Sequence, residues 1–134
     1  MANQQQLDLL KQGVTIWNQW RKKYPDIPID LSGADLTGIE LRGFILEEIG
    51  IEERVDLSHA NLSRTTLSFA DLTHACLTGA CLREVNLSRA DLRSSDLTGA
   101  NLRGAYLSPR DAQRDMSINK VALDLSSLHS CSLR

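Results

Sequence analysis

Leucine returns at every fifth residue along most of this chain, and the positions between successive leucines are mostly polar. The longest unbroken run of these leucine centres is Leu57, Leu62, Leu67, Leu72, Leu77, Leu82, Leu87, Leu92, Leu97, Leu102 and Leu107. The residue two positions before each centre is small or β-branched, and the residue just before it is usually Asp or Asn. A pattern this regular predicts a repeated structural unit of five residues, with the leucine and the small residue as its core positions.

A period of five fits neither of the two regular elements. In an α-helix, a step of five residues turns the side chain by about 140° beyond a full turn, so the leucines would share no face. In a flat strand, successive leucines would lie on opposite faces because five is an odd number. A chain that turns a corner every five residues can direct every leucine to one interior. Such a unit buries its apolar side only by stacking on its neighbours, so the pattern predicts a solenoid.

The same period continues on both sides of the longest run. Earlier centres are Leu31, Leu36, Leu41, Leu46 and Ile51, and later centres are Ile118, Leu123, Leu128 and Leu133, with Leu125 as an alternative register. The step from Leu46 to Leu57 is two periods plus one residue, so we expect a bulge or loop near residues 47–56. A second irregular stretch is expected at residues 109–117.

Blocks such as ADLTG, ANLSR, ADLTH and ANLRG resemble the pentapeptide repeat family, whose pattern is A-(D/N)-L-x-x. The resemblance covers residues 29–108 and, more loosely, the rest of the chain. It implies an all-β solenoid, a right-handed quadrilateral β-helix with four pentapeptides per coil, and about five coils in this chain. Residues twenty apart would then stack. The expected columns are Asp56, Cys76 and Asp96; Asn61, Cys81 and Asn101; Arg64 and Glu84; and Arg83 and Arg103.

The first 28 residues lack the repeat and carry apolar residues at helical spacing. The main apolar positions are Leu7, Leu10, Val14, Trp17 and Trp20. We expect one amphipathic helix over Gln4–Lys23, with Asn3 and Gln6 resembling a capping box at its start. Because a solenoid exposes an apolar cross-section at its ends, residues 1–28 are predicted to cap a repeat domain that spans 29–134. The alternative is that the basic residues of this helix bind an anionic membrane or a partner.

Composition agrees with a narrow interior, because 42% of the residues are hydrophobic but only 4% are aromatic, and a ring would overfill such a tube. The N-terminus lacks the features of a signal peptide, and no apolar run is long enough to span a membrane, so we expect a cytoplasmic protein. The odd number of cysteines favours free thiols. His74, Cys76 and Cys81 could suggest a metal site, but the two cysteines should point from different sides of the coil. No catalytic residues, cofactor or metal are expected.

The charge is nearly balanced, with 15 basic and 17 acidic residues, which argues against a basic nucleic-acid binder. Acidic residues are concentrated in residues 31–54, which carry six of them against two arginines. Glu47, Glu48, Glu52 and Glu53 form a possible interaction loop for a basic partner, or simply a solvated loop. Phe69, at an outward position of its block, is a weaker candidate for a surface contact.

A rod with flat sides offers a surface but no cleft, so we expect a non-enzymatic scaffold or a protein–protein interaction module of unknown partner. The resemblance implies two alternatives. One is a DNA mimic that binds a topoisomerase such as gyrase, and the balance of five acidic and five basic residues in 55–108 argues against it. The other is a regulator of a bacterial signalling or developmental pathway. The C-terminal coil has no obvious cap, so a homodimer through it, near Leu128, is a further possibility.

Overall fold

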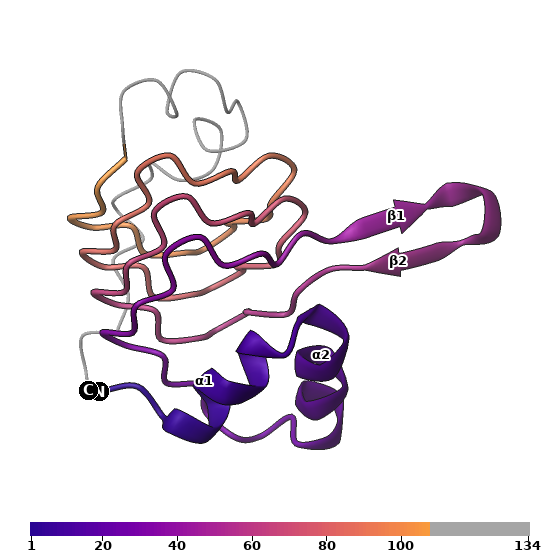
Figure 1. The fold of residues 1–134 in the computed structure, drawn as a ribbon, viewed down its shortest axis with the longest axis horizontal. Helices are drawn as coiled ribbons and strands as arrows, with labels where there is room; N and C mark the ends of the chain where they lie inside the picture. Colours follow the sequence, from indigo (N-terminus) through magenta and orange to yellow (C-terminus); the bar gives the residue numbers. More distant parts are fainter. Residues whose placement is uncertain (108–134) are drawn as a thin grey trace.

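The computed structural model describes residues 1–107, in which two N-terminal helices lie at one end of a stack of coils (Figure 1). The elements are α1 (Gln4–Lys11), α2 (Val14–Lys23), β1 (Phe44–Leu46), the 3-10 turn η1 (Glu47–Ile49) and β2 (Ile51–Glu53). Among these residues, neither helix is long and apolar enough to cross a membrane. The expected irregular stretch at 109–117, the register after it and the C-terminal dimer contact lie outside the described residues.

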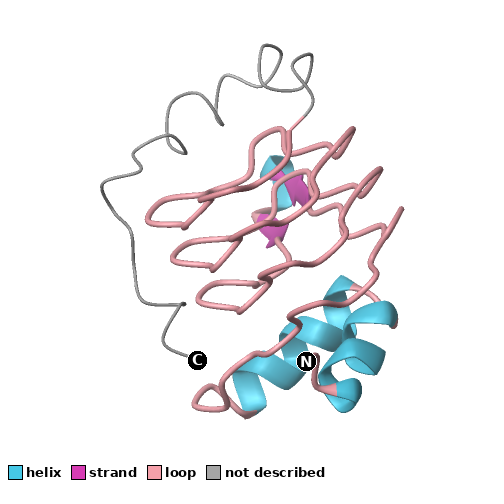
Figure 2. Cartoon of the chain, turned by 90° about the vertical axis from the view of Figure 1, so that its left-hand side faces the viewer, coloured by secondary structure: helices cyan, strands magenta, loops and turns pink. Residues whose placement is uncertain are grey.

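The coils are held together by backbone pairing between residues twenty apart. Asp56 pairs with Cys76, and Cys76 pairs with Asp96, in parallel bridges. The hydrogen bonds follow the same spacing; for example, the Leu57 N–H donates to the Cys76 carbonyl oxygen at 2.9 Å. Each complete coil therefore contains four pentapeptides, and the predicted columns of stacked residues are confirmed. Figure 2 shows these coils lying one above another over the helices.

The Asp or Asn before each leucine shapes the corner that follows it. The Oδ1 atom of Asp71 accepts the Thr73 backbone N–H at 3.1 Å and the Thr73 hydroxyl at 2.7 Å. The next residue, His74, has a φ of 66°, and the Ala75 N–H then donates to the Leu72 carbonyl oxygen at 2.9 Å. A short polar side chain that holds the backbone two residues later is a common turn device. It explains why Asp or Asn before the leucine goes with Ser or Thr after it in most of the blocks.

The leucines and the small residues fill the interior of the coils. The centres from Leu57 to Leu102 are at most 6% exposed, and Leu107, the last one described, is half-buried. Burying a leucine fully contributes about 1.5–3 kcal/mol. Two interior positions are polar, and each finds a backbone acceptor: the Thr65 hydroxyl donates to the Leu62 carbonyl at 2.7 Å, and the Ser95 hydroxyl to the Leu92 carbonyl at 2.5 Å. The buried hydroxyls are therefore satisfied within the repeat.

The first coil supplies only three of its four sides. Its pairs are Asp30 with Asn61, Asp35 with Thr66 and Glu40 with Asp71, each separated by 31 residues instead of twenty. The extra residues form the hairpin of β1 and β2, which projects sideways from the coils (Figure 1). The prediction that Leu46 is a core centre was wrong, since it lies in β1 and is 48% exposed. Ile51 lies in β2, so the irregular stretch begins at Phe44 and not near 47.

Helix α2 lies where the fourth side of the first coil would be, and its side chains bond to the backbone of the coil above. Asn18 Oδ1 accepts the Asp56 N–H at 2.9 Å. The Asp56 carbonyl oxygen accepts Trp17 Nε1 at 2.7 Å and Arg21 Nη1 at 3.1 Å. Arg21 Nη2 donates to the Ser58 carbonyl oxygen at 3.2 Å. Three side chains thus pair with backbone groups that the open edge leaves without a strand.

A regular side of the solenoid shows what these side chains replace. The Asn61 N–H donates to the Ile29 carbonyl at 2.9 Å, and the Asn61 carbonyl accepts the Leu31 N–H at 2.9 Å. Asp56 holds the equivalent position on the fourth side, where no lower coil supplies those partners. Helix α2 therefore substitutes side-chain groups for the missing strand, which is a more specific role than covering an apolar cross-section.

Helix α1 covers the first side of the same coil. Gln6 Oε1 accepts the Asp30 N–H at 2.8 Å, while Gln6 Nε2 donates to the Pro28 carbonyl at 2.9 Å. Asn3 caps the helix by accepting the Gln6 N–H at 3.1 Å, but the Gln6 side chain is used on the coil and does not complete a capping box. The prediction of one helix over Gln4–Lys23 was wrong, because Gly13, with a φ of 109°, separates α1 from α2.

Candidate interaction surface at the hairpin

The hairpin leaves the first coil through a tight neck at Gly43. A Cβ at this position would lie 2.5 Å from the Glu53 carbonyl oxygen and 3.1 Å from His74 Cβ. Only glycine lets the outgoing and returning backbones approach so closely. The strands then pair antiparallel, with Phe44 opposite Glu53 and Leu46 opposite Ile51. This pairing satisfies the backbone of the segment outside the coils, so the hairpin is a structural element of its own.

The far end of the hairpin combines exposed apolar and acidic side chains. Ile49 is 67% exposed and Leu46 is 48% exposed. Glu48 is also exposed, and Gly50 closes the tip with a φ of 68°. Exposed apolar groups at a projecting tip gain nothing from the protein's own core, whereas a partner could bury them. This tip is therefore the best candidate for a docking element among the described residues.

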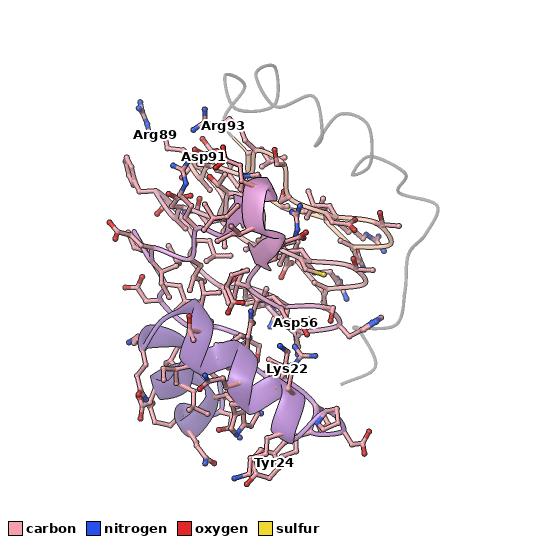
Figure 3. All side chains as sticks on the ribbon, turned by 90° about the vertical axis from the view of Figure 1, so that its right-hand side faces the viewer. Lys22, Tyr24, Asp56, Arg89, Asp91 and Arg93 are labelled. Carbon is pink, nitrogen blue, oxygen red and sulfur yellow. The ribbon has the colours of Figure 1, made fainter. Side chains whose placement is uncertain are left out.

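A shallow cleft lies at the base of the hairpin, between α2 and the second coil. Its volume is about 270 Å³, and it is lined by Asn18, Lys22, Glu52, Glu53, Arg54 and Asp56. Figure 3 shows Lys22 and Asp56 near each other at this level of the molecule. Asn18 Nδ2 donates to Glu53 Oε1 at 3.3 Å and to the Arg54 carbonyl at 2.6 Å. Glu52 pairs with Arg54, and Glu53 accepts from Asn18, so two of the carboxylates in this cleft hold the base of the hairpin.

Arg54 joins the base of the hairpin to the coils above. Its guanidinium pairs with Glu52 and also donates from Nη1 to the His74 carbonyl at 3.3 Å and to the Ser94 carbonyl at 3.5 Å. Arg54 therefore reaches along the corner where the third side of the solenoid ends. The Nδ1 atom of His74 is buried there and has no hydrogen-bond partner in the described part of the chain. These contacts fix where the hairpin starts and in which direction it projects.

The perturbed carboxylates of the repeat are explained by the corners they build. Hydrogen bonds from Thr37 and Thr98 lower the pKa of Asp35 and of Asp96, respectively. The Arg93 side chain lowers the pKa of Asp91 through a hydrogen bond, against the opposing effect of partial burial. Each carboxylate is stabilised in its charged form by a residue two positions later. A lowered pKa keeps a carboxylate ionised, and here the ionised form stabilises the turn.

The structure places the sequence-predicted residues as follows. Of the predicted cap residues, Leu10 and Trp17 are fully buried, and Leu7, Val14 and Trp20 are partly buried against the core. Of the predicted interaction loop, Glu47 and Glu48 lie in η1, and Glu52 and Glu53 lie in β2. The structure therefore gathers these four residues on one hairpin, although Glu53 is tied to Asn18. Phe69 is 63% exposed at a corner.

The cysteines and histidines do not gather. Cys76 is a free thiol on the fourth side, whereas Cys81 is disulfide-bonded, which corrects the expectation of free thiols for that residue. Within residues 1–107, no group of three or more His, Cys, Asp or Glu side chains could hold a metal ion. Sequence reasoning missed Asn18 and Arg21 as partners of the open coil edge. It also missed the hairpin, although Gly43 precedes its first strand and Gly50 lies in its tip, and such glycines are a turn signal.

The repeat itself decides the family. The model of the pentapeptide repeats matches residues 53–89 and 86–108 in eight copies. This segment belongs to the pentapeptide repeat family. The family forms right-handed quadrilateral β-helices and is generally non-catalytic. The pairing of residues twenty apart in this chain agrees with four pentapeptides per coil. No curated protein matches the chain.

Three solved structures are similar to parts of the chain, one of a resistance protein and two of pentapeptide repeat proteins. QnrB1, a plasmid-mediated fluoroquinolone resistance protein, is 21% identical over 57% of this chain and 32% of its own, with a TM-score of 0.34. A pentapeptide repeat protein from the Arabidopsis thaliana thylakoid lumen is 28% identical over 55% of this chain and 53% of its own, with a TM-score of 0.27. A pentapeptide repeat protein from Nostoc Pcc 7120 is 27% identical over 66% of this chain and 78% of its own, with a TM-score of 0.22. The chain thus spans about a third and about half of the first two.

Proposed function

We propose that this pentapeptide repeat chain is a non-enzymatic interaction module whose docking element is the hairpin of β1, η1 and β2. The observation that carries the proposal is the exposed pair Leu46 and Ile49 at the far end of a hairpin that projects from a rigid stack of coils. The coils supply a fixed base, and the hairpin supplies an acidic, partly apolar surface that stands clear of it. This arrangement suits recognition of a partner with basic and apolar groups.

Mimicry of DNA is not favoured by the charge of the coils. Residues 55–108 carry five acidic and five basic side chains, so the repeat offers no continuous acidic surface. The excess of acidic residues in 31–54 comes largely from the hairpin, which holds four of the six. A local acidic element of this kind fits a docking contact better than replacement of a whole duplex.

Affinity capture with the purified full-length protein tests the docking role. The variant Leu46→Ser/Ile49→Ser removes the apolar tip and keeps the carboxylates. Ile27→Ser is the matched control, because Ile27 is 41% exposed but lies outside the hairpin. We expect the wild type and the control to retain the same partners and the hairpin variant to lose them. If all three proteins capture the same set, the hairpin is not the docking element.

A further inference from the structure

The second side of the solenoid, together with the two corners that bound it, carries a surface whose chemistry is opposite to that of the hairpin. It is made of Arg64, Phe69, Arg83, Arg89, Arg103 and Tyr106, which we call the basic-aromatic face. Phe69 is 63% exposed and Tyr106 is 60% exposed. The Arg89 guanidinium lies 6.0 Å from the centre of the Phe69 ring, so a basic and an aromatic group are adjacent on this face.

The repeat stacks like charges on this face. Arg83 and Arg103 occupy equivalent positions in adjacent coils, as the bridge between Cys81 and Asn101 requires. Neither guanidinium forms an ion pair within residues 1–107, although the charge of Arg83 contributes to the lowered pKa of Glu84. Arg64, one corner position further on, pairs with Glu84 at 2.8 Å. Like charges opposite each other on neighbouring strands are destabilising. A partner that brings carboxylates to this face would remove that repulsion.

The two surfaces lie on different parts of the rod. The hairpin leaves after Gly43, at the corner between the third and fourth sides of the first coil, and it projects away from the coils (Figure 1). The basic-aromatic face lies on the second side and the two corners that bound it, and the hairpin leaves from neither of these corners. Arg89, one of its members, is near the end of the molecule remote from the helices in Figure 3. The hairpin of one molecule therefore cannot cover its own basic-aromatic face.

We propose that the hairpin of one copy of this chain docks on the basic-aromatic face of a second copy. The hairpin offers exposed Glu48 for the arginines, and exposed Leu46 and Ile49 for the aromatic rings. Because the two surfaces differ, the contact is heterologous, and repeating it joins copies head to tail. The inference rests on the docking role of the hairpin and names its occupant. Nucleic acid is a less suitable occupant of this face, because Glu84 lies within it and the chain has a net charge of −2.

Sedimentation of the full-length protein against concentration tests the contact. At low salt we expect the average mass of the wild type to rise from that of a monomer to at least twice that value, and to return to the monomer at high salt. Two variants reverse the charges: Glu48→Lys on the hairpin and Arg83→Glu/Arg103→Glu on the face. Each variant alone is expected to remain monomeric, with an unchanged circular dichroism spectrum.

Mixing the two variants gives the decisive measurement. The reversed hairpin of one then meets the reversed face of the other, so the equimolar mixture is expected to associate as the wild type does. A monomeric wild type, a mixture that stays monomeric, or association that persists in either variant alone would overturn the proposal. Binding of a labelled DNA duplex by the monomer, lost in Arg83→Glu/Arg103→Glu, would assign the face to nucleic acid and would also overturn it. None of these outcomes affects the capture experiment, which tests the hairpin with other proteins.

Discussion

Replacing Asn18 by alanine should weaken the attachment of α2 to the open side of the first coil. Asn18 is 8% exposed, and its carboxamide accepts the Asp56 N–H at 2.9 Å and donates to the Arg54 carbonyl at 2.6 Å. Leaving such buried backbone groups unpaired costs about 1–3 kcal/mol. Alanine is the better helix former, which offsets about 0.5 kcal/mol. The free energy of unfolding is therefore expected to fall by about 0.5–2.5 kcal/mol.

Urea unfolding can resolve this effect because the two tryptophans of the chain, Trp17 and Trp20, both lie in α2. Their fluorescence follows the cap, and circular dichroism follows the coils. We expect Asn18→Ala to move the fluorescence transition to lower urea, with a smaller shift of the circular dichroism transition. Gln19→Ala is the matched control, since Gln19 is the exposed neighbour on the same helix. If the two variants unfold at the same urea concentration, Asn18 does not replace a strand partner and the reasoning fails.

Three further outcomes follow from other contacts. Trp17→Phe keeps a ring but loses the 2.7 Å hydrogen bond to the Asp56 carbonyl, so urea unfolding should show a loss of unfolding free energy of at least about 0.5–1.5 kcal/mol. The control is Trp20→Phe, for which we expect a loss no larger than that of Trp17→Phe. Gly43→Ala would place a methyl group 2.5 Å from the Glu53 carbonyl and should destabilise the protein by about 1–3 kcal/mol, whereas an unchanged unfolding midpoint would contradict the tight neck. The lowered pKa of Asp91 stabilises the fold above the ordinary Asp pKa of about 3.9, and this contribution should disappear as the pH falls through the lower folded pKa. Asp91→Asn should accordingly reduce the loss of stability between neutral and strongly acidic pH, measured by urea unfolding, and an identical pH profile would refute the assignment.

The sequence was sufficient to predict the repeat because the residues that form each corner and fill the interior lie within the same pentapeptide. The Asp or Asn before the leucine builds the corner locally, as Asp71 does with Thr73, and the leucine and the small residue define the interior. Once the period of five is recognised, the stacking partners follow from position alone. The pair of Arg64 and Glu84 was predicted in this way, and the structure places the two side chains in contact at 2.8 Å.

The period of five predicted the wrong structure where the chain can form a local hairpin instead. Leu46 continues the spacing of five, yet antiparallel pairing with Ile51 satisfies the backbone and takes Leu46 out of the coil. The glycines at 43 and 50 favour this route, because one permits a close backbone approach and the other a left-handed turn. The candidate site could therefore be located roughly, from its four glutamates, but its shape and its exposed apolar tip could not.

The sequence by itself determined the solenoid, the size of its coil and the composition of its interior, because those properties depend on residues five and twenty positions apart and recur in every repeat. Only the tertiary structure decided how the first coil ends. Its fourth side is missing, and Trp17, Asn18 and Arg21 take over the backbone partners from a helix more than thirty residues away in sequence. No repeat specifies such a contact, since it forms once, between unlike elements, and depends on where the whole helix lies. The projection of the hairpin is the other consequence of that missing side, and it gives the chain the surface through which we expect it to act.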